Sequence, residues 1–178
     1  MRSRRTGAFF RIAIASLAWV AGMSPAIAAV APPPEPAKDV AFWRSVGPGK
    51  PWTETKRFSP FGAGAKAGSI AAHDLGSDGV DEILAGSGFG VPPLVRVLRG
   101  DGSEILSFAP FDAGMLQGVD VAMGDLNGDG KAEIVAGAGP GAAAHVRVFD
   151  NLGKETILPG GFFPLGQDLR GGVNLAVA

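Results

Sequence analysis

Beyond residue 39, hydrophobic residues occur in short runs that glycine and proline interrupt. The runs are three to six residues long and rich in β-forming residues, and apolar and polar positions alternate, as in Val119–Met123. This period of two is typical of half-buried strands, and no segment shows the sustained i, i+3, i+4, i+7 apolar stripe of a helix. The best-defined stretch predicts four strands, at Val119–Met123, Glu133–Ala136, His145–Phe149 and Thr156–Leu158.

The same pattern occurs twice, 51 residues apart. When residues 125–157 are aligned with residues 74–106 without a gap, fifteen of the thirty-three positions are identical. In addition, Gly118–Ala122 recurs as Gly172–Ala176. A Phe-Pro element precedes each such stretch, at residues 58–61, 108–111 and 162–165. Self-similarity at a fixed spacing indicates a repeat architecture.

The repeats define the expected fold. We count two complete units, about 58–107 and 108–161, with the tail of one unit before them and the first strand of another after them. Four short antiparallel strands per unit are the composition of a β-propeller blade, and propellers typically use about four to eight blades. We therefore expect an all-β, propeller-type array of four-stranded antiparallel blades that is incomplete. Such a chain is expected either to be truncated or to self-associate through its open blade edges.

A loop in the second unit carries the strongest chemical signal. Side-chain oxygens stand at positions 1, 3, 5 and 9 of its sequence DLNGDGKAE, a glycine at position 6 permits a sharp reversal, and the carbonyl at position 7 can point inward. Calcium takes about six to eight oxygen ligands in forgiving geometry, whereas magnesium requires a stricter octahedron. The loop is therefore predicted to bind Ca²⁺ through Asp125, Asn127, Asp129, the main-chain carbonyl of Lys131, and Glu133.

Other readings of this loop can be separated by spacing. An EF-hand has its bidentate acid at position 12, which is Ala136 here, and the residues after Glu133 predict a strand rather than a helix. A hairpin turn without metal stays open as an alternative, because Asn, Asp and Gly are common turn residues.

The first unit holds a weaker copy of the loop. Asp74, Asp78 and Glu82 keep positions 1, 5 and 9, but Gly76 replaces the asparagine at position 3. One ligand is lost, so we expect this loop to bind Ca²⁺ less well than the second.

The order of these motifs resembles the FG-GAP/VCBS repeats of exported bacterial proteins, and it is similar to the calcium-loop blades of integrin α-chains. The motifs are Gly-Val-x-Val-Ala-x-Gly-Asp, the acidic loop, Ile-Val-x-Gly-x-Gly and Val-Arg-Val-Phe-Asp. The resemblance covers roughly residues 54–178. It implies a β-propeller, loop-bound Ca²⁺, and a role in adhesion or surface recognition. The chain departs from the family pattern at Gly76 and in its small number of blades.

The N-terminus predicts export. Residues 1–28 combine three early arginines, an apolar run at 12–23 and a small-x-small cleavage site at 26–28, which is the pattern of a signal peptide. The run is shorter than the roughly 20 residues that a membrane-spanning helix requires, so no membrane span is expected. A proline-rich linker (29–38) and the repeat region (39–178) follow. We expect a secreted or periplasmic protein, cleaved near Ala28.

Charge and composition narrow the classes of partner. Cleavage would remove four arginines and no acids, leaving twelve Lys and Arg against seventeen Asp and Glu, a net charge of −5 instead of −1. No basic cluster would remain, which argues against a nucleic-acid partner. There is no cysteine, so an exported fold must depend on its core, on bound metal or on both rather than on disulfides.

The remaining chemistry-bearing residues are predicted to be structural. The glycine-rich segments lack the Lys-Ser/Thr of a P-loop, and strands follow where a helix would be required. His73 and His145 have no counterpart at the matching repeat positions and are expected to be surface or strand residues. Arg96 and Arg147 share a repeat position and are expected to face outward or form cross-strand ion pairs. No Ser-His-Asp set or carboxylate pair stands outside the repeat pattern, so the chain is not expected to be an enzyme.

These observations lead to one functional expectation and one alternative. The chain is expected to be an exported calcium-binding repeat module for adhesion or surface recognition, with a protein or a glycan as its partner at the cell surface or outside the cell. The alternative is an auxiliary β-propeller domain of a secreted hydrolase or lyase whose catalytic part is absent from this chain.

Overall fold

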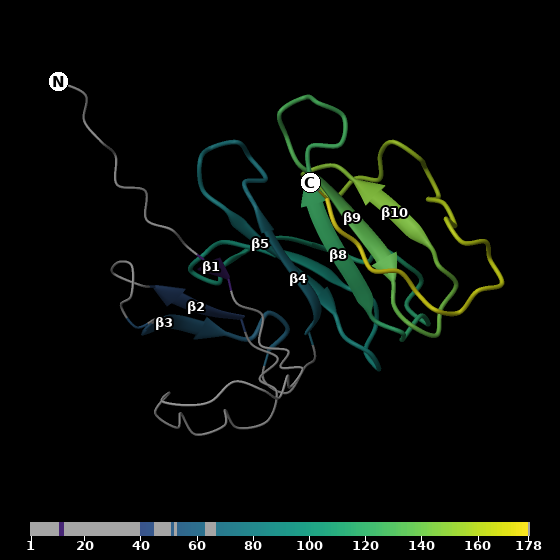
Figure 1. Ribbon diagram of the computed structural model, residues 1–178, viewed down its shortest axis with the longest axis horizontal. Coiled ribbons are helices and arrows are strands. Elements are labelled where there is room, and N and C mark those ends of the chain that lie inside the picture. Colours follow the sequence, from purple (N-terminus) through teal and green to yellow (C-terminus); the bar gives the residue numbers. More distant parts are fainter. Residues whose placement is uncertain (1–10, 13–39, 45–50, 52, 63–66, 178) are drawn as a thin grey trace, which may run out of the picture. The chain divides into compact units, whose positions relative to one another are not determined.

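The protein is described by a computed structural model that covers residues 11–12, 40–44, 51, 53–62 and 67–177. In this part of the chain every regular element is a β-strand (Figure 1), which confirms the predicted all-β class. None of the described residues belongs to a helix long and apolar enough to cross a membrane. The chain divides into two compact units, Met1–Phe58 and Ser59–Ala178, and we describe each by itself.

The first unit contains a three-stranded antiparallel sheet in the order β1-β2-β3. Its strands are β1 (Arg11–Ile12), β2 (Val40–Arg44) and β3 (Thr53–Phe58). The rings of Phe42 and Phe58 lie 6.0 Å apart between β2 and β3. β2 begins one residue after residue 39, where the repeat region was predicted to start. Apart from residues 11–12, the predicted signal peptide (1–28) and linker (29–38) lie outside the described residues.

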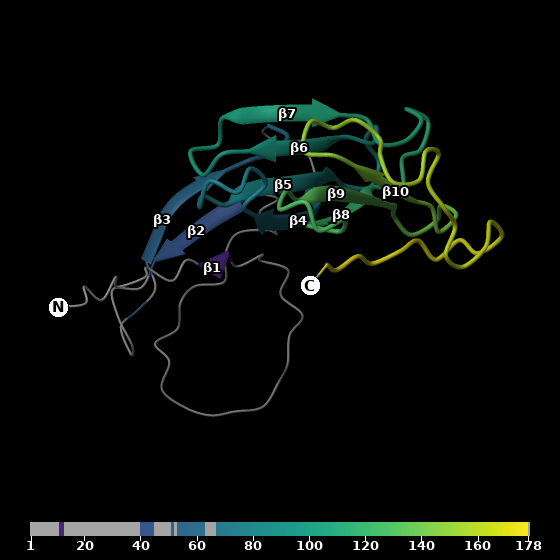
Figure 2. The ribbon, with the colours of Figure 1, turned by 90° about the horizontal axis from the view of Figure 1, so that it is seen from above.

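The second unit begins with a four-stranded antiparallel sheet in the order β4-β5-β6-β7 (Figure 2). Its strands are β4 (Ala67–His73), β5 (Glu82–Ser87), β6 (Val95–Leu98) and β7 (Glu104–Phe108). Strands that follow one another in the chain pair with one another, so the sheet is a simple meander. This is the four-stranded blade that the sequence predicts for the first repeat.

The second repeat forms a three-stranded antiparallel sheet in the order β10-β9-β8. Its strands are β8 (Val119–Gly124), β9 (Glu133–Ala138) and β10 (Val146–Phe149). Three of the four predicted strands are thus confirmed, but the fourth is wrong, because Thr156–Leu158 forms no strand. Isolated bridges from Phe149 to Glu155 and from Val146 to Phe162 stand in its place.

An insertion of three residues explains the missing strand. Glu104 to Phe108 spans five residues and pairs continuously with β6, whereas the equivalent stretch from Glu155 to Phe162 spans eight. The ends of the longer stretch pair with β10, and its middle must leave the sheet. Ile157 accommodates the exit with a left-handed φ of 63°, a conformation that costs energy for a β-branched residue.

The two sheets of the second unit pack against each other through one hydrophobic core. The Phe108 and Phe149 rings, one from each sheet, lie 4.6 Å apart. Buried core residues from the two sheets include Leu84, Val95, Val97, Val119, Val121, Met123, Ile134 and Ala136. Each large aliphatic side chain buried in this way contributes about 1.5–3 kcal/mol. This shared core therefore holds the two sheets of the second unit together.

A polar contact between consecutive repeats occurs twice. Ser69 of β4 accepts a hydrogen bond from the main-chain amide of Val121 in β8, at 3.2 Å. Asp120, its repeat counterpart, accepts one from the amide of Leu175, at 2.6 Å. Residues 172–177 therefore lie against the β8–β10 sheet as β8 lies against the β4–β7 sheet. This is the place predicted for the first strand of a following unit.

Two glycines permit the close approach of consecutive repeats. A Cβ at Gly86 would lie 2.3 Å from the carbonyl oxygen of Val119, and a Cβ at Gly137, its repeat counterpart, would lie 2.3 Å from Val173 Cγ2. Both distances are far shorter than a van der Waals contact, and at Gly86 the nearest atom belongs to the backbone, so only glycine fits there, whereas at Gly137 the nearest atom belongs to a side chain. The glycine-rich segments are thus structural, as predicted.

The two repeated arginines link each repeat to the Phe-Pro element before it. Arg147 donates to both carboxylate oxygens of Glu155, at 2.8 and 2.5 Å, and to the main-chain carbonyl of Pro110 in the preceding Phe-Pro element, at 2.6 Å. The Glu155 carboxylate raises the pKa of Arg147 further, although burial opposes this shift. Arg96 makes the same proline contact at 2.8 Å, but its Nε lies 3.2 Å from Glu104 without hydrogen-bond alignment. Both predicted ion pairs are present, and the pair of the second repeat, Arg147 with Glu155, is the shorter.

Candidate metal centre

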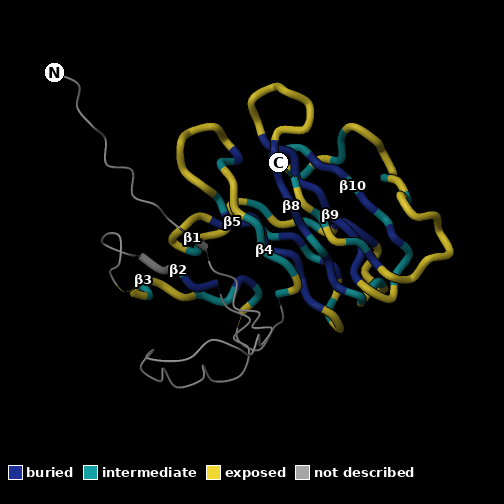
Figure 3. The backbone as a smooth tube through the Cα atoms, viewed as in Figure 1, coloured by how far each residue is buried: buried dark blue, intermediate teal, exposed yellow. Residues whose placement is uncertain are grey.

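The acidic loop of the second repeat connects β8 to β9 and is exposed along most of its length (Figure 3). Asp125, its first residue, accepts three main-chain hydrogen bonds, from Gly128 at 2.6 Å, Asp129 at 3.2 Å and Gly130 at 2.9 Å. Gly130 has a φ of 85°, so the predicted reversal at position 6 does use the left-handed region that favours glycine. The Asp125 carboxylate is therefore the centre around which the loop folds.

These hydrogen bonds also set the charge of the loop. The main-chain amide of Gly130, followed by those of its neighbours, holds the pKa of Asp125 below its usual range, although desolvation opposes the shift. Hydrogen bonds to the ionised form stabilise it. Asp125 is accordingly a carboxylate at neutral pH, as a calcium ligand must be.

Glu133 closes the loop from the first position of β9. Its side chain is 3% exposed, and its Oε2 accepts the main-chain amide of Leu126 at 2.8 Å. Its Oε1 accepts Asn127 Nδ2 at 2.6 Å, and the same nitrogen lies 3.3 Å from Asp129 Oδ2. The Asn127 amide hydrogens thus stand between two carboxylates, where their partial positive charge is favourable.

No basic side chain neutralises this loop within the described residues. The three carboxylates of Asp125, Asp129 and Glu133 form no ion pair there, and the Lys131 side chain is exposed and unpaired. Yet within residues 67–177 no three His, Asp or Glu side chains converge closely enough to hold a metal by themselves. Any cation in this loop must therefore also use the amide and carbonyl oxygens that the sequence predicts at positions 3 and 7.

The loop of the first repeat has the same frame with one side chain fewer. Asp74 accepts the amides of Asp78 at 3.0 Å and Gly79 at 2.7 Å, and Glu82 accepts the amide of Leu75 at 3.0 Å. The Gly79 amide is the main cause that lowers the pKa of Asp74. Gly76 places nothing between the carboxylates, so this loop lacks the bridging amide of the second.

The two loops touch each other. Ser77 donates a hydrogen bond from its hydroxyl to the main-chain carbonyl of Gly130. Ser77 has a φ of 57°, which is uncommon for a residue with a side chain. His73, by contrast, is an exposed residue at the end of β4, as predicted. The structure thus brings both predicted sites to the same edge of the stacked sheets (Figure 1).

Comparison with known protein families gives a match within the second repeat. Residues 118–149 match the FG-GAP repeat family. The chain contains an FG-GAP repeat. The matched residues comprise β8, the acidic loop, β9 and β10, so the FG-GAP repeat coincides with the blade whose loop carries the fuller set of side-chain oxygens. No curated protein matches the chain, and no solved structure does.

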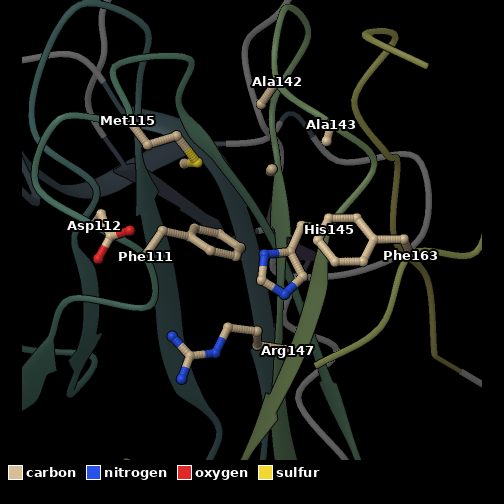
Figure 4. Close-up of a pocket in the computed structure, with 9 residues that line it drawn as sticks. Phe111, Asp112, Met115, Ala142, Ala143, His145, Arg147 and Phe163 are labelled. Atoms are coloured by element: carbon tan, nitrogen blue, oxygen red, sulfur yellow. The ribbon is translucent and has the colours of Figure 1, made fainter. Parts of the chain in front are cut away.

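Sequence reasoning did not single out every side chain that the fold brings together near the FG-GAP repeat. Asp112 and Phe163 share a pocket with His145 and Arg147 (Figure 4). The available signal was the mismatch between copies, because Asp112 stands where the other Phe-Pro elements continue with glycine.

Proposed function

We propose that this chain is an exported module in which Ca²⁺, bound by the loop of the FG-GAP repeat, stabilises a surface that recognises a protein or a glycan. The observation that carries the proposal is the meeting of Asp129 and Glu133 on the amide of Asn127, next to an ionised Asp125. The loop holds three carboxylates that no basic side chain among the described residues neutralises, and a divalent cation is the simplest partner for them.

The donor set fits calcium. Carboxylate, amide and carbonyl oxygens are hard ligands, and the loop offers neither sulfur nor imidazole, which softer transition metals favour. Asp125, Asn127, Asp129, the carbonyl of Lys131, and Glu133 would hold the ion, and Asp74, Asp78 and Glu82 would form the weaker site. Bound calcium supplies a compact double positive charge that neutralises the acidic loop.

The residues of the loop would act in different ways. Main-chain amides already orient Asp125, and the Leu126 amide holds the buried Glu133 carboxylate. Turning the Asn127 amide about its terminal torsion would bring its oxygen to the meeting point of the carboxylates, at the cost of the hydrogen bond that this oxygen accepts from the main-chain amide of Asp129 at 2.8 Å. Only Asn127 and Asp129 would then need to reorient, so most of the ordering cost is already met by the fold.

Recognition can be tested on the secreted protein. Arrays of immobilised glycans and of surface proteins would be probed in millimolar calcium and again in EGTA, with Asp129→Ala as the calcium-site variant. We expect retention on a defined group of ligands in calcium and loss of retention in EGTA. Equal retention in both, or none on either array, would refute the proposed role of calcium in recognition.

A further inference from the structure

A pocket lies at the other end of β9 from the acidic loop. It encloses about 240 Å³ and is lined by Phe111, Asp112, Met115, His145, Arg147 and Phe163, among others (Figure 4). Drug-sized ligands usually occupy pockets of about 300–1,000 Å³. This one has room for a single small ring.

Aromatic contacts fix the wall of the pocket. The His145 ring stacks on Phe163, with 4.3 Å between ring centres and 16° between planes, and lies 5.3 Å from the Phe111 ring. His145 Nε2 is 2.8 Å from the carbonyl of Gly160. The imidazole is therefore held in one orientation, and no described residue bonds its second nitrogen.

The pocket gathers the residues that depart from the repeat. Three of its members are replaced elsewhere in the chain, with Leu94 in place of His145, Gly62 and Gly166 in place of Asp112, and Ser59 and Ala109 in place of Phe163. Arg147, in contrast, has its counterpart in Arg96. The repeat fold does not require these three departures, so their meeting in one cavity indicates a ligand site of this blade alone.

The charges in the pocket select the class of ligand. Arg147 already donates from all three nitrogens to Glu155 and a main-chain carbonyl, so it has little left to offer an anion. The negative charge of Asp112 also raises the pKa of Arg147, so this carboxylate already has a cationic neighbour and needs no cationic ligand. The Asp112 carboxylate is exposed and accepts no hydrogen bond from any residue that the structure describes. A neutral ligand with hydroxyl donors for Asp112 and an apolar face for the aromatic wall fits this arrangement best.

We infer that the pocket binds one neutral pyranose ring, the terminal unit of a glycan. The C–H face of the sugar would lie on the aromatic wall, whose ring faces are electron-rich, and its hydroxyls would face Asp112 and the second nitrogen of His145. This inference rests on the proposed recognition function, since it names the ligand class, but the pocket and the acidic loop use separate residues.

The test is a titration with a panel of neutral methyl pyranosides, observed in the ring resonances of His145 and the phenylalanines by NMR. At least one glycoside should shift the His145 resonances and saturate at millimolar concentration. Asp112→Ala removes a charged hydrogen-bond acceptor and should weaken that glycoside about tenfold. His145→Leu, which restores the residue of the first repeat, should weaken it similarly. Asp81→Ala, an exposed acid at the opposite edge, is the matched control and should leave the affinity unchanged.

Several results would overturn the inference. These are no shift with any glycoside, an affinity that Asp112→Ala leaves intact, or a response to acetate or tetramethylammonium instead. If His145→Leu fails to fold, Asp112→Ala decides, because that side chain is exposed. Running each titration with calcium and with EGTA separates the two proposals. Glycoside binding without any calcium-dependent stabilisation would support the pocket and refute the calcium site, and the reverse would refute the pocket alone.

Discussion

Replacing Gly86 with alanine should destabilise the repeat region by about 3 kcal/mol. The new Cβ would stand 2.3 Å from the carbonyl oxygen of Val119 and 3.0 Å from Val121 Cγ1, so β8 would have to move by about 1 Å away from the first sheet. Overpacking of this kind typically costs about 1–3 kcal/mol, and the upper end applies because the nearest atom belongs to the backbone. Gly137→Ala should cost less, about 1 kcal/mol, because it meets the end of the Val173 side chain, which can turn aside.

Urea unfolding of the three single variants Gly86→Ala, Gly137→Ala and Gly100→Ala checks this ranking. A Cβ at Gly100 meets no atom within 4 Å, which makes that variant the control. The loss of about 3 kcal/mol for Gly86→Ala corresponds to a melting temperature roughly 10 °C below that of the control. If Gly86→Ala and Gly100→Ala unfold at the same urea concentration, the two sheets do not pack as described.

Three further predictions concern the loops and the arginine links. Calorimetric titration should show that Asp129→Ala reduces calcium affinity or stoichiometry more than Asp78→Ala, because the second loop has the fuller ligand set; the reverse order would contradict our ranking. The contribution of Asp125 to the free energy of unfolding, measured without metal, should be fully present above about pH 5. It should fall as the pH drops through the lowered pKa of Asp125, since the unfolded chain takes up the proton first. Asp125→Asn should flatten that part of the pH profile, and an unchanged profile would refute the assignment. Arg147→Met should cost about 1–2 kcal/mol and Arg96→Met less than about 1 kcal/mol in thermal unfolding, given their partial exposure; equal losses would contradict the difference in geometry.

Much of the fold could be predicted because the same pattern of strand and turn residues occurs in two copies. Alternation over Val119–Met123 predicts a strand, and the recurrence of the glycine-rich segments predicts that they are structural, although the close contacts of Gly86 and Gly137 are visible only in the structure. The prediction failed where the copies differ in length. Three extra residues before Phe162 prevent a strand at Thr156–Leu158. The β-propensity of those three residues could not predict this, because it contains no information on the pairing of Glu155 and Phe162 with β10.

The candidate site divides in the same way. Spacing alone predicts which oxygens line the loop, because positions 1, 3, 5 and 9 belong to one short segment. The placement of the Asn127 nitrogen between two carboxylates depends on side-chain torsions, and the contact of Ser77 with Gly130 depends on how the blades stack. The pocket of Asp112 and Phe163 joins residues some fifty positions apart. Mismatch with the repeat marked each of them, but only the fold brings them together.

The central claim, that the loop of the FG-GAP repeat binds calcium, is tested most directly by the melting temperature of the protein in EGTA and in millimolar calcium. At free calcium about a hundredfold above the dissociation constant, binding stabilises the folded state by about 2.7 kcal/mol, which corresponds to a rise of roughly 10 °C. Asp129→Ala should reduce the rise, and magnesium at the same concentration should produce a smaller one. A melting temperature that is the same in EGTA and in millimolar calcium would contradict the account.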